Sequence, residues 1–580
     1  MAAEFKSKKG LVSKPPYQLY MAFTDMRNFV QFLPEDKKAD VTADFDSIHA
    51  MVQGFNIGVK VVDRTPYSKI EFADDGAPFS FRLKMLFDAA ADPYKTDFQI
   101  VADAELNFMM KTILESKIKE SFRKYLEEAI GSKNALVAFS AFDADASVSV
   151  RLNPFKNAAG AELWNDARKV PWNALGRILE ERPVFTLDPC FHTGAYYVQD
   201  SSSMFVGEVF RKVLTGMDIP QGRPLRVLDL CAAPGGKTTD LAASLREAVD
   251  DRFILVANEV MKQRAGVLAE NVALWGDPNV VVTSDDPKAF ASLPGYFDII
   301  VADVPCSGEG MFRKDEEAQN QWSEDNVALC WARQRRIIAD MWPSLADGGV
   351  LIYSTCTFNR FENDDNVAWV ASELGAEVIT PFAEDDYAGF GVIRTDKGYS
   401  LVPGHVEGEG QYCGALRKTS DMNVRYVESQ PRRQKSSPKV GTVATDGLES
   451  WFTAEVIFRQ RGETIIAVPQ AIASEVQQVE GTLHVIAAGC AAGCFKGRNF
   501  VPDADMALSM ILNRDACPSV DVDRDTALAF LHKDAVAFPD APLGYLMLVY
   551  DGLPLGFVKN LGNRCNSLHP QSRRIRMNIK

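Results

Sequence analysis

The sequence of 580 residues lacks a long apolar run, although hydrophobic residues make up 46% of it. A helix that crosses a bilayer needs about 20 consecutive apolar residues, and no stretch approaches that length. Residues 1–10 also lack the apolar core and the small-residue cleavage site of a signal peptide. We therefore expect a soluble protein of the cytoplasm with no membrane partner.

Positive charge and cysteine are both scarce. The 63 Lys and Arg face 78 Asp and Glu, which gives a formal net charge of -15. Nonspecific binding to nucleic acid depends largely on Lys and Arg that neutralise phosphates, so this balance argues against a generic nucleic-acid coat. If RNA is the substrate, the positive charge that binds it must be local. The ten cysteines fit free thiols in a reducing compartment better than a disulfide framework.

A zinc site with its usual spacing is also missing. Cys490, Cys494 and His484 have the look of metal ligands but lack a fourth partner at the spacing of a zinc site. Packing is the better account of these three residues, and we expect no metal.

The first hundred residues predict a sheet. Apolar and polar residues alternate in several short runs within residues 5–103, with turn signals between them, which indicates antiparallel strands. Apolar residues at helical spacing follow from Leu106 to Ile130 and predict one long helix or two abutting ones. This order resembles the START-like (SRPBCC) helix-grip fold over about residues 4–118, a family that often encloses an apolar ligand. A folded accessory domain without a ligand is the alternative, since a fold alone does not determine function.

The rest of the chain divides by pattern. Strands and helices alternate in residues 205–375, which predicts a Rossmann-like, doubly wound α/β sheet. Residues 417–450 include a polar, basic stretch with Pro and Ser that is typical of a linker. We predict a multidomain protein with five segments: the START-like α+β domain at 1–118, an entry region at 119–204, the α/β domain at 205–420, the linker at 421–450 and an α+β unit at 451–580.

A run of small residues separates the first predicted strand of the α/β domain from a helix: Cys231, Ala232, Ala233, Pro234, Gly235, Gly236 and Lys237. Small residues let a ligand approach the backbone, and a helix N-terminus offers free N–H groups to a carboxylate. The spacing matches neither the dinucleotide G-x-G-x-x-G nor the P-loop, which disfavours NAD and ATP.

Acidic residues follow the next two predicted strands. Glu259 is placed to bind ribose hydroxyls, with Arg264 further along the same helix, and Asp286 is placed to accept from an adenine amino group. Taken alone, each acidic residue is more often a helix cap or a loop residue. Together with Asp229, they put carboxylates at three successive strand ends, which predicts an adenosine site.

Two cysteines stand directly after two further strands. Asp303-Val-Pro-Cys306 follows one, and Thr-Cys356-Thr ends the other. Ligands of open α/β sheets sit at such strand ends. Free cysteines are usually buried and structural, but reactive ones need polar, accessible surroundings of this kind.

These motifs carry a resemblance. Residues 231–237 (Cys-Ala-Ala-Pro-Gly-Gly-Lys), 303–306 (Asp-Val-Pro-Cys) and 354–357 (Ser-Thr-Cys-Thr), in this order, resemble the RNA cytosine-5 methyltransferases of the Nop/Sun type. Four further segments resemble the bacterial ribosomal RNA branch of that family, the RsmF type: 197–199, 308–314, 408–410 and 556–564. The resemblance covers about residues 119–580.

The resemblance implies S-adenosylmethionine as methyl donor and a cytosine in RNA, above all 16S ribosomal RNA, as acceptor. Cytosine C5 is a poor nucleophile, so a thiolate adds to C6 first; after methylation the C5 proton and the enzyme must both leave. By family correspondence Cys356 is the nucleophile, Cys306 assists proton removal and release, and Asp303 hydrogen-bonds N3 and the exocyclic amine.

The resemblance also implies ligand-binding residues and partners. It gives residues 119–204 and a PUA-like domain at 451–580 to RNA binding, and ribosomal RNA or the small ribosomal subunit as the partner of a monomer. The implied cofactor-binding residues are 231–237, Glu259, Arg264, Asp286 and Asp303, and the implied RNA-binding residues are Arg313, Lys314, Lys559, Arg564 and Arg574. Surface solvation is the alternative for these cations. A transfer RNA methyltransferase and a ribosome-assembly RNA-binding factor are the alternative functions.

Overall fold

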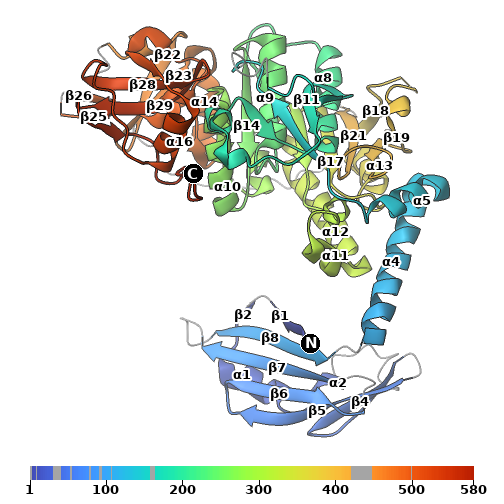
Figure 1. Ribbon diagram of the computed structural model, residues 1–580. Coiled ribbons are helices and arrows are strands. Elements are labelled where there is room, and N and C mark those ends of the chain that lie inside the picture. Colours follow the sequence, from blue (N-terminus) through green and yellow to red (C-terminus); the bar gives the residue numbers. More distant parts are fainter. Residues whose placement is uncertain are drawn as a thin grey trace. The chain divides into compact units, whose positions relative to one another are not determined.

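The computed structural model describes residues 3–7, 10–30, 41–52, 55–76, 80–89, 95–105, 108–156, 163–383, 385–419, 447–497 and 499–579. The chain divides into two compact units, Met1–Ser121 and Phe122–Lys580 (Figure 1). The division falls within one long helix, α4 (Phe108–Ile130). Among the described residues, no helix is both long enough and apolar enough to span a membrane.

The first unit is built on an antiparallel sheet, as the alternating pattern predicts. Its order is β1-β8-β7-β6-β5-β4-β3, and β2 also pairs with β8. Two short helices, α1 (Pro16–Phe23) and α2 (Arg27–Val30), come before β3, and the core includes Tyr20, Phe72 and Phe87. The strands are β1 (Ala3–Lys6), β2 (Gly10–Val12), β3 (Val41–Ala43), β4 (Ser47–Val52), β5 (Phe55–Thr65), β6 (Lys69–Asp74), β7 (Ser80–Ala89) and β8 (Thr96–Glu105).

The second unit is organised around a ten-stranded sheet with the order β19-β20-β21-β17-β16-β13-β14-β15-β24, and β18 also pairs with β21. Its five central strands are parallel: β13 (Leu225–Asp229), β14 (Phe253–Asn258), β15 (Val280–Thr283), β16 (Phe297–Asp303) and β17 (Leu345–Thr355). The antiparallel edge strands are β18 (Ala376–Ile379), β19 (Ile393–Arg394), β20 (Tyr399–Leu401), β21 (Gln411–Lys418) and β24 (Val485–Ala487).

Helices cover both faces of this sheet, which confirms the predicted doubly wound arrangement. One apolar core joins the sheet to α8 (Phe205–Thr215), α9 (Gly236–Val249) and α10 (Lys262–Trp275). The core on the other face joins it to α12 (Glu324–Met341) and α13 (Asp364–Glu373). The strand order reverses between β13 and β16, and ligands of such sheets bind at that point.

A four-stranded sheet precedes the central one in sequence. Its order is β10-β11-β9-β12, and its strands are β9 (Val148–Leu152), β10 (Arg168–Val170), β11 (Asn173–Leu179) and β12 (Tyr196–Val198). Helix α5 (Ser132–Ala141) comes before it, and α7 (Pro189–Thr193) lies between β11 and β12. Trp172 and Ile178 of this region belong to the same apolar core as α8 and α9.

The C-terminal part holds two small sheets. The first is β22 (Val456–Arg461), β23 (Thr464–Pro469), β25 (Cys490–Lys496) and β26 (Asn499–Pro502). The second is β27 (Ser519–Asp521), β28 (Gly544–Tyr550), β29 (Leu553–Asn560) and β30 (Cys565–Ser567). Three helices accompany these sheets: α14 (Ala473–Thr482), α15 (Ala504–Leu508) and α16 (Arg524–His532).

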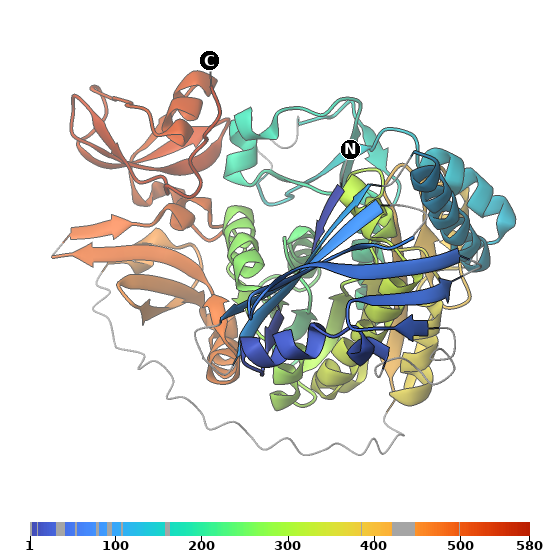
Figure 2. The ribbon, with the colours of Figure 1, turned by 90° about the horizontal axis from the view of Figure 1, so that it is seen from below.

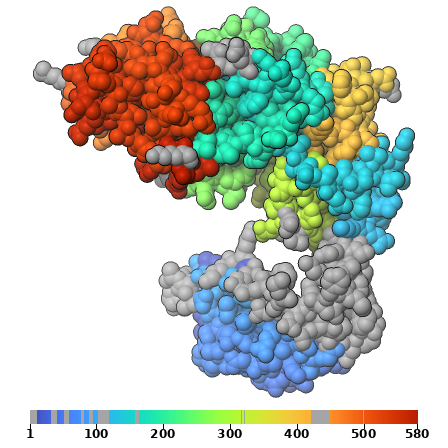
Figure 3. Space-filling model, in the orientation of Figure 1, coloured from blue at the N-terminus to red at the C-terminus, as the bar shows by residue number. Residues whose placement is uncertain are grey.

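This C-terminal part is not a separate appendage. Its strand β24 pairs with β15 at the edge of the central sheet, and α14 packs into the core of α12 and α13 (Figure 2). Leu553 of β29 packs with Phe185 and Tyr196, so the C-terminal surface adjoins the region around α7 (Figure 3). The sequence pattern alone did not predict this interleaving.

Candidate active site

The predicted site residues gather at the carboxyl ends of the parallel strands. Asp229 ends β13, Asp303 ends β16, and Cys356 directly follows β17. Parallel pairing keeps these ends level, since Asp229 lies opposite Val301 and Asp303 lies opposite Ser354. The position of the site therefore follows from strand direction and register.

The two thiols of the site are in contact. The Cys306 and Cys356 sulfurs lie 3.1 Å apart, and both side chains are half-buried and free of disulfides. The Gly310 N–H donates to the Cys356 carbonyl at 2.8 Å and holds one loop against the other. The hydrogen bond with Cys356, followed by burial, raises the pKa of Cys306 well above its usual range. Cys306 therefore keeps its proton beside the other sulfur at neutral pH.

Asp303 is hydrogen-bonded through both of its oxygens beside the thiols. Its Oδ2 pairs with the Lys237 ammonium at 2.8 Å, and its Oδ1 accepts from Ser354 at 2.8 Å and Gln411 at 3.0 Å. Burial works against the charged form, but Lys237 outweighs it and lowers the pKa of Asp303. The pKa of Lys237 is raised, since Asp303 outweighs the effect of burial on that side chain too. Asp303 is therefore a carboxylate at neutral pH.

The loop of residues 231–237 is held from its outer side. Arg264 donates to the Ala233 carbonyl at 2.8 Å, and Asn271 donates to the Pro234 carbonyl at 2.7 Å. No side chain before Lys237 in this loop is larger than those of Cys and Pro. A ligand can therefore reach the backbone at the start of α9.

Asp229 is fully buried beside this loop. Its Oδ2 accepts from Thr238 at 2.7 Å, whereas its Oδ1 has no hydrogen-bond partner among the described residues. Burial raises the pKa of Asp229 to about 7. The unpartnered oxygen is thus a buried acceptor next to the loop.

Three known sequence families match this chain. "16S rRNA methyltransferase RsmB/F" matches residues 220–417, "N-terminal domain of 16S rRNA methyltransferase RsmF" matches 118–201, and "Methyltransferase RsmF PUA domain" matches 517–575. The ribosomal RNA small subunit methyltransferase F of Pectobacterium atrosepticum is 30% identical over 445 residues, which are 73% of this chain and 88% of that protein. The chain belongs to the RsmF family of 16S rRNA methyltransferases.

Other RsmF proteins align over similar lengths. The one from Cronobacter sakazakii is 30% identical over 500 residues, 78% of this chain and 96% of that protein. The one from Klebsiella pneumoniae is 32% identical over 394 residues, 65% and 78% of the two chains. The crystal structure of NSun6 from Pyrococcus horikoshii has a TM-score of 0.43 and 19% identity, and the match covers 52% of this chain and 98% of that one.

Methyltransferases of the RsmB/F type depend on S-adenosylmethionine, and the predicted adenosine residues offer suitable groups. Glu259 pairs with Arg264 at 3.3 Å and is nearly fully buried. Asp286 caps a short helical turn by accepting from the Lys288 N–H at 3.2 Å. Each carboxylate keeps acceptor capacity that fits ribose hydroxyls and an adenine amine. Asp286 is thus a helix cap in this structure, the alternative that the sequence left open.

The two cations after Cys306 are engaged within the protein. Arg313 donates to Glu409 at 2.8 and 3.0 Å and to the Gly408 carbonyl at 2.8 Å, and only 7% of its side chain is exposed. The predicted RNA contact by Arg313 is therefore not supported, because its guanidinium is buried in an ion pair. Lys314 is about one-third exposed and lies 3.3 Å from Asp200.

The predicted C-terminal cations lie on or after β29. Lys559 stands 5.6 Å from the centre of the Tyr545 ring, and Arg564 is exposed. Arg574 is half-buried, and its Nε has no partner among the described residues. Arg564 is the one of the three best placed for solvent contact.

Cys490 packs in the core of the C-terminal sheets, and burial raises its pKa to about 12. In the part of the chain that the structure describes, no three His, Cys, Asp or Glu side chains group as metal ligands.

Two buried carboxylates behind the thiols were missed by the sequence reasoning. Glu309 is fully buried, and its Oε2 accepts from the backbone N–H groups of Phe358 at 2.6 Å and Asn359 at 3.0 Å. Its Oε1 accepts from Trp322 at 2.9 Å and from the Asn359 amide at 2.9 Å. Glu309 thus ties the loop after Cys306 to the loop after Cys356. The only sequence signal was its place within the segment 308–314.

Glu362 makes the same link in the other direction. Its Oε2 accepts from the Ser307 N–H at 3.0 Å and from Gln334 at 2.6 Å, and its Oε1 accepts from the Asn359 amide at 2.8 Å. Burial, and next the nearby Glu309, raises the pKa of Glu362 to about 7. No local sequence pattern distinguishes Glu362 from a surface residue, because two of its partners, Ser307 and Gln334, lie far from it in sequence.

Proposed function

We propose that this protein transfers a methyl group from S-adenosylmethionine to C5 of a cytosine in 16S ribosomal RNA, through a covalent bond between Cys356 and C6. The observation that carries the proposal is the 3.1 Å contact of the two thiols next to the Asp303 carboxylate. One thiol can add to the base while the other handles the proton. A site for binding alone has no need of a second thiol.

Cys356 gives up its thiol proton, which passes through solvent to N3 of the base, and its sulfur adds to C6, which pushes the electron pair of the C5–C6 double bond toward C5. When bound, S-adenosylmethionine supplies the methyl group that this carbon attacks. Asp303 accepts hydrogen bonds from the exocyclic amine and from protonated N3, and so stabilises the charge on the adduct. Lys237 keeps Asp303 ionised for this task.

The adduct must then resolve. Cys306 lies beside Cys356, and its raised pKa keeps it protonated at rest, so it must first give its own proton to solvent; the thiolate that forms is then a strong base. We assign it the removal of the C5 proton, after which the electron pair restores the C5–C6 bond and expels the Cys356 sulfur. The target base must leave its stack to reach this site, at a cost of a few kcal/mol.

Further features of the proposal concern partners and domains. We infer that four cations contact RNA: Lys314, Lys559, Arg564 and Arg574. We infer that the partner is ribosomal RNA or the small ribosomal subunit, and that the protein is a cytoplasmic monomer without metal.

We infer a START-like domain over residues 1–118, which the antiparallel sheet between short helices and α4 supports. Removing residues 1–118 should leave RNA methylation unchanged if that domain has a separate task.

Bisulfite mapping of RNA from cells with and without the protein tests the function. The loss of one 5-methylcytosine from 16S ribosomal RNA is the expected result. A lost site in transfer RNA would favour a transfer RNA methyltransferase instead. If no site is lost, an RNA-binding assembly factor becomes the better account.

A further inference from the structure

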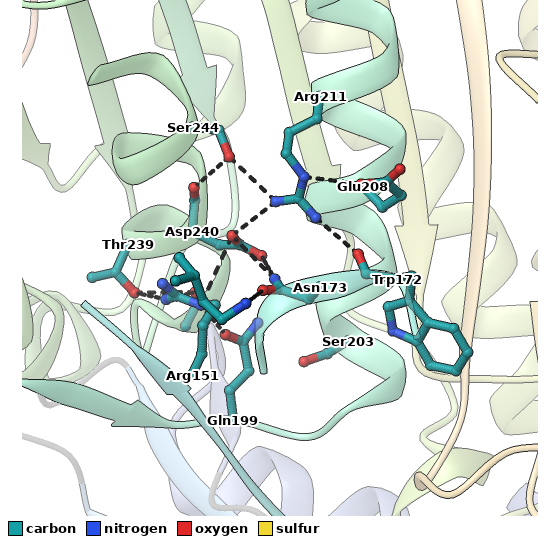
Figure 4. A network of polar contacts seen from close by, with 12 residues as sticks. Arg151, Trp172, Asn173, Gln199, Ser203, Glu208, Arg211, Thr239, Asp240 and Ser244 are labelled. Carbon is teal, nitrogen blue, oxygen red and sulfur yellow. Dashed lines mark hydrogen bonds and ion pairs between the residues drawn. The ribbon is translucent and has the colours of Figure 1, made fainter. Parts of the chain in front are cut away.

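Arg151 is a fully buried cation behind the loop of residues 231–237. It lies on β9, outside the central sheet, and none of its surface is exposed. Burying an unpaired charge costs several kcal/mol, so each contact of this guanidinium needs an account. Figure 4 shows its surroundings, which come from the four-stranded sheet on one side and from α8 and α9 on the other.

The hydrogen bonds of Arg151 go mainly to the first turn of α9. Its Nη2 donates to the Gly236 carbonyl at 3.1 Å and to the Thr239 hydroxyl at 2.5 Å. The Thr239 hydroxyl in turn donates to the Gly235 carbonyl at 2.9 Å. The Arg151 Nε donates to Gln199 at 2.8 Å. Two of these three bonds end on the helix turn that follows the predicted cofactor loop.

Arg151 shares its acidic partner, Asp240, with Arg211, and makes no hydrogen bond to it. Asp240 lies 3.9 Å from its Nε, beyond hydrogen-bond distance, and also pairs with Arg211 at 3.2 Å and faces Asn173 at 3.3 Å. Asp240 thus balances the charge of Arg151 without orienting its guanidinium. The flat face of that group lies 4.6 Å from the centre of the Trp275 ring on α10. Orientation therefore comes from three neutral groups, the Gly236 carbonyl, the Thr239 hydroxyl and the Gln199 amide, and from Trp275.

Other residues of the same sheet also press on this loop. A side-chain carbon added at Gly236 would lie 3.3 Å from Tyr197 and 3.6 Å from Gln199. The region matched to the RsmF N-terminal domain therefore forms the back wall of the loop.

We propose that Arg151 is a positioning residue for the cofactor loop, and that β9, β12 and Gln199 thereby form part of the S-adenosylmethionine site. The inference rests on the proposed function, since it takes residues 231–237 as the cofactor loop. The region before the central sheet then supports cofactor binding in addition to any RNA contact it makes.

Arg177 provides a matched control. It is also a buried arginine of this sheet, with 8% of its surface exposed. It lies on β11, opposite Val150 of the neighbouring strand β9. Its hydrogen bonds go to the carbonyls of Ala174 and Gly176 in its own strand, and neither of these two bonds reaches the loop. Arg177→Met therefore removes a buried cation without removing a contact to α9.

Calorimetric titration of the full chain with S-adenosylhomocysteine tests the proposal. Arg151→Met should weaken binding by about 10- to 100-fold, the scale of one or two charged hydrogen bonds, and Arg177→Met by less than about 3-fold. At saturating RNA and varied donor, Arg151→Met should raise KM for S-adenosylmethionine more than it lowers kcat. A general loss of structure would instead weaken RNA and cofactor binding alike in both variants.

Each outcome decides a different claim. If Arg151→Met and the native protein bind S-adenosylhomocysteine equally well, the positioning role is wrong. If the native protein itself does not bind it, the proposed function fails instead. Should Arg151→Met not fold, Arg151→Lys replaces it, because lysine keeps the positive charge but loses the forked guanidinium. We expect Arg151→Lys to bind S-adenosylhomocysteine about 3- to 10-fold more weakly. Unchanged binding would contradict the positioning role.

Discussion

The cofactor loop (residues 231–237) and the two thiol loops (304–312 and 356–363) are both held from behind by buried charged side chains, but of opposite sign. Arg151 donates to the Gly236 carbonyl at the start of α9. Glu309 and Glu362 accept from the backbone N–H groups of the thiol loops. Each charge thus suits the polarity of the backbone groups that it contacts: the cation meets a carbonyl oxygen, and the anions meet N–H groups.

The difference in sign has a chemical consequence. The negative charge of Glu362 favours the protonated form of the Cys306 thiol, after the larger effects of Cys356 and burial. The positive charge of Arg151 instead lies beside the loop that we propose binds S-adenosylmethionine, a ligand with a carboxylate. Substitutions of the two supports should therefore have different effects. Substitutions of Glu309 or Glu362 should alter chemistry at the thiols, and substitutions of Arg151 should alter cofactor affinity.

The largest difference between the effect on methyl transfer and the effect on cofactor binding is expected for the nucleophile itself. Cys356→Ala should abolish methyl transfer, a loss on the order of 10⁶-fold in kcat, the scale seen when a catalytic nucleophile is removed. Binding of S-adenosylhomocysteine should stay within about 2-fold of the native value, because the cofactor loop is intact. Methyl transfer from labelled donor to 16S ribosomal RNA measures the first, and calorimetry the second. Cys330→Ala, at a buried cysteine of α12, is the control and should remain active.

The supporting carboxylates should have the next largest effect. Glu309→Gln replaces an acceptor oxygen by an amide, which leaves part of the contacts to Phe358, Asn359 and Trp322 unmade. We expect kcat to fall by about 10- to 100-fold with little change in cofactor affinity. Glu373→Gln, at an exposed glutamate of α13, is the control. A loss of cofactor affinity equal to the loss in kcat would remove the distinction between the two supports.

The raised pKa of Glu362 predicts a pH effect on stability. The folded carboxyl has a pKa of about 7, above its ordinary value of 4.5, so the folded state binds this proton more tightly than the unfolded state. Its contribution is full below about pH 4.5 and is lost as pH rises through 7. The thermal midpoint of the native protein relative to Glu362→Gln should therefore fall between about pH 5 and pH 8. A constant difference across this interval would place the charge on Glu362 throughout.

The smallest effect is expected outside both loops. Arg564→Ala removes an exposed cation and should weaken binding to 16S ribosomal RNA by about 3- to 10-fold while lowering the salt dependence by about one phosphate contact. Filter binding at several salt concentrations measures both.

Arg313→Ala should instead lower stability, because it leaves Glu409 buried without its partner. A steeper loss of salt dependence for Arg313 than for Arg564 would restore Arg313 as an RNA contact.

What the sequence could predict depended on local order along the chain. Asp303, Cys306 and Cys356 were brought together by strand direction alone, because the carboxyl ends of adjacent parallel strands meet at one edge. The interactions of Arg313 and Glu362 depend on residues 28 to 168 positions away in sequence, so periodicity could not reveal them. For the same reason the pairing of β24 with β15 was not foreseen.

The central claim is the division of labour between the two thiols, and covalent trapping tests it most directly. Each variant is incubated with S-adenosylmethionine and substrate RNA, denatured, and separated by gel electrophoresis. Cys306→Ala should accumulate a denaturant-stable protein–RNA complex, because the adduct forms but does not resolve, and Cys356→Ala should form none. A stable complex with Cys356→Ala and none with Cys306→Ala would contradict the account and reverse the roles.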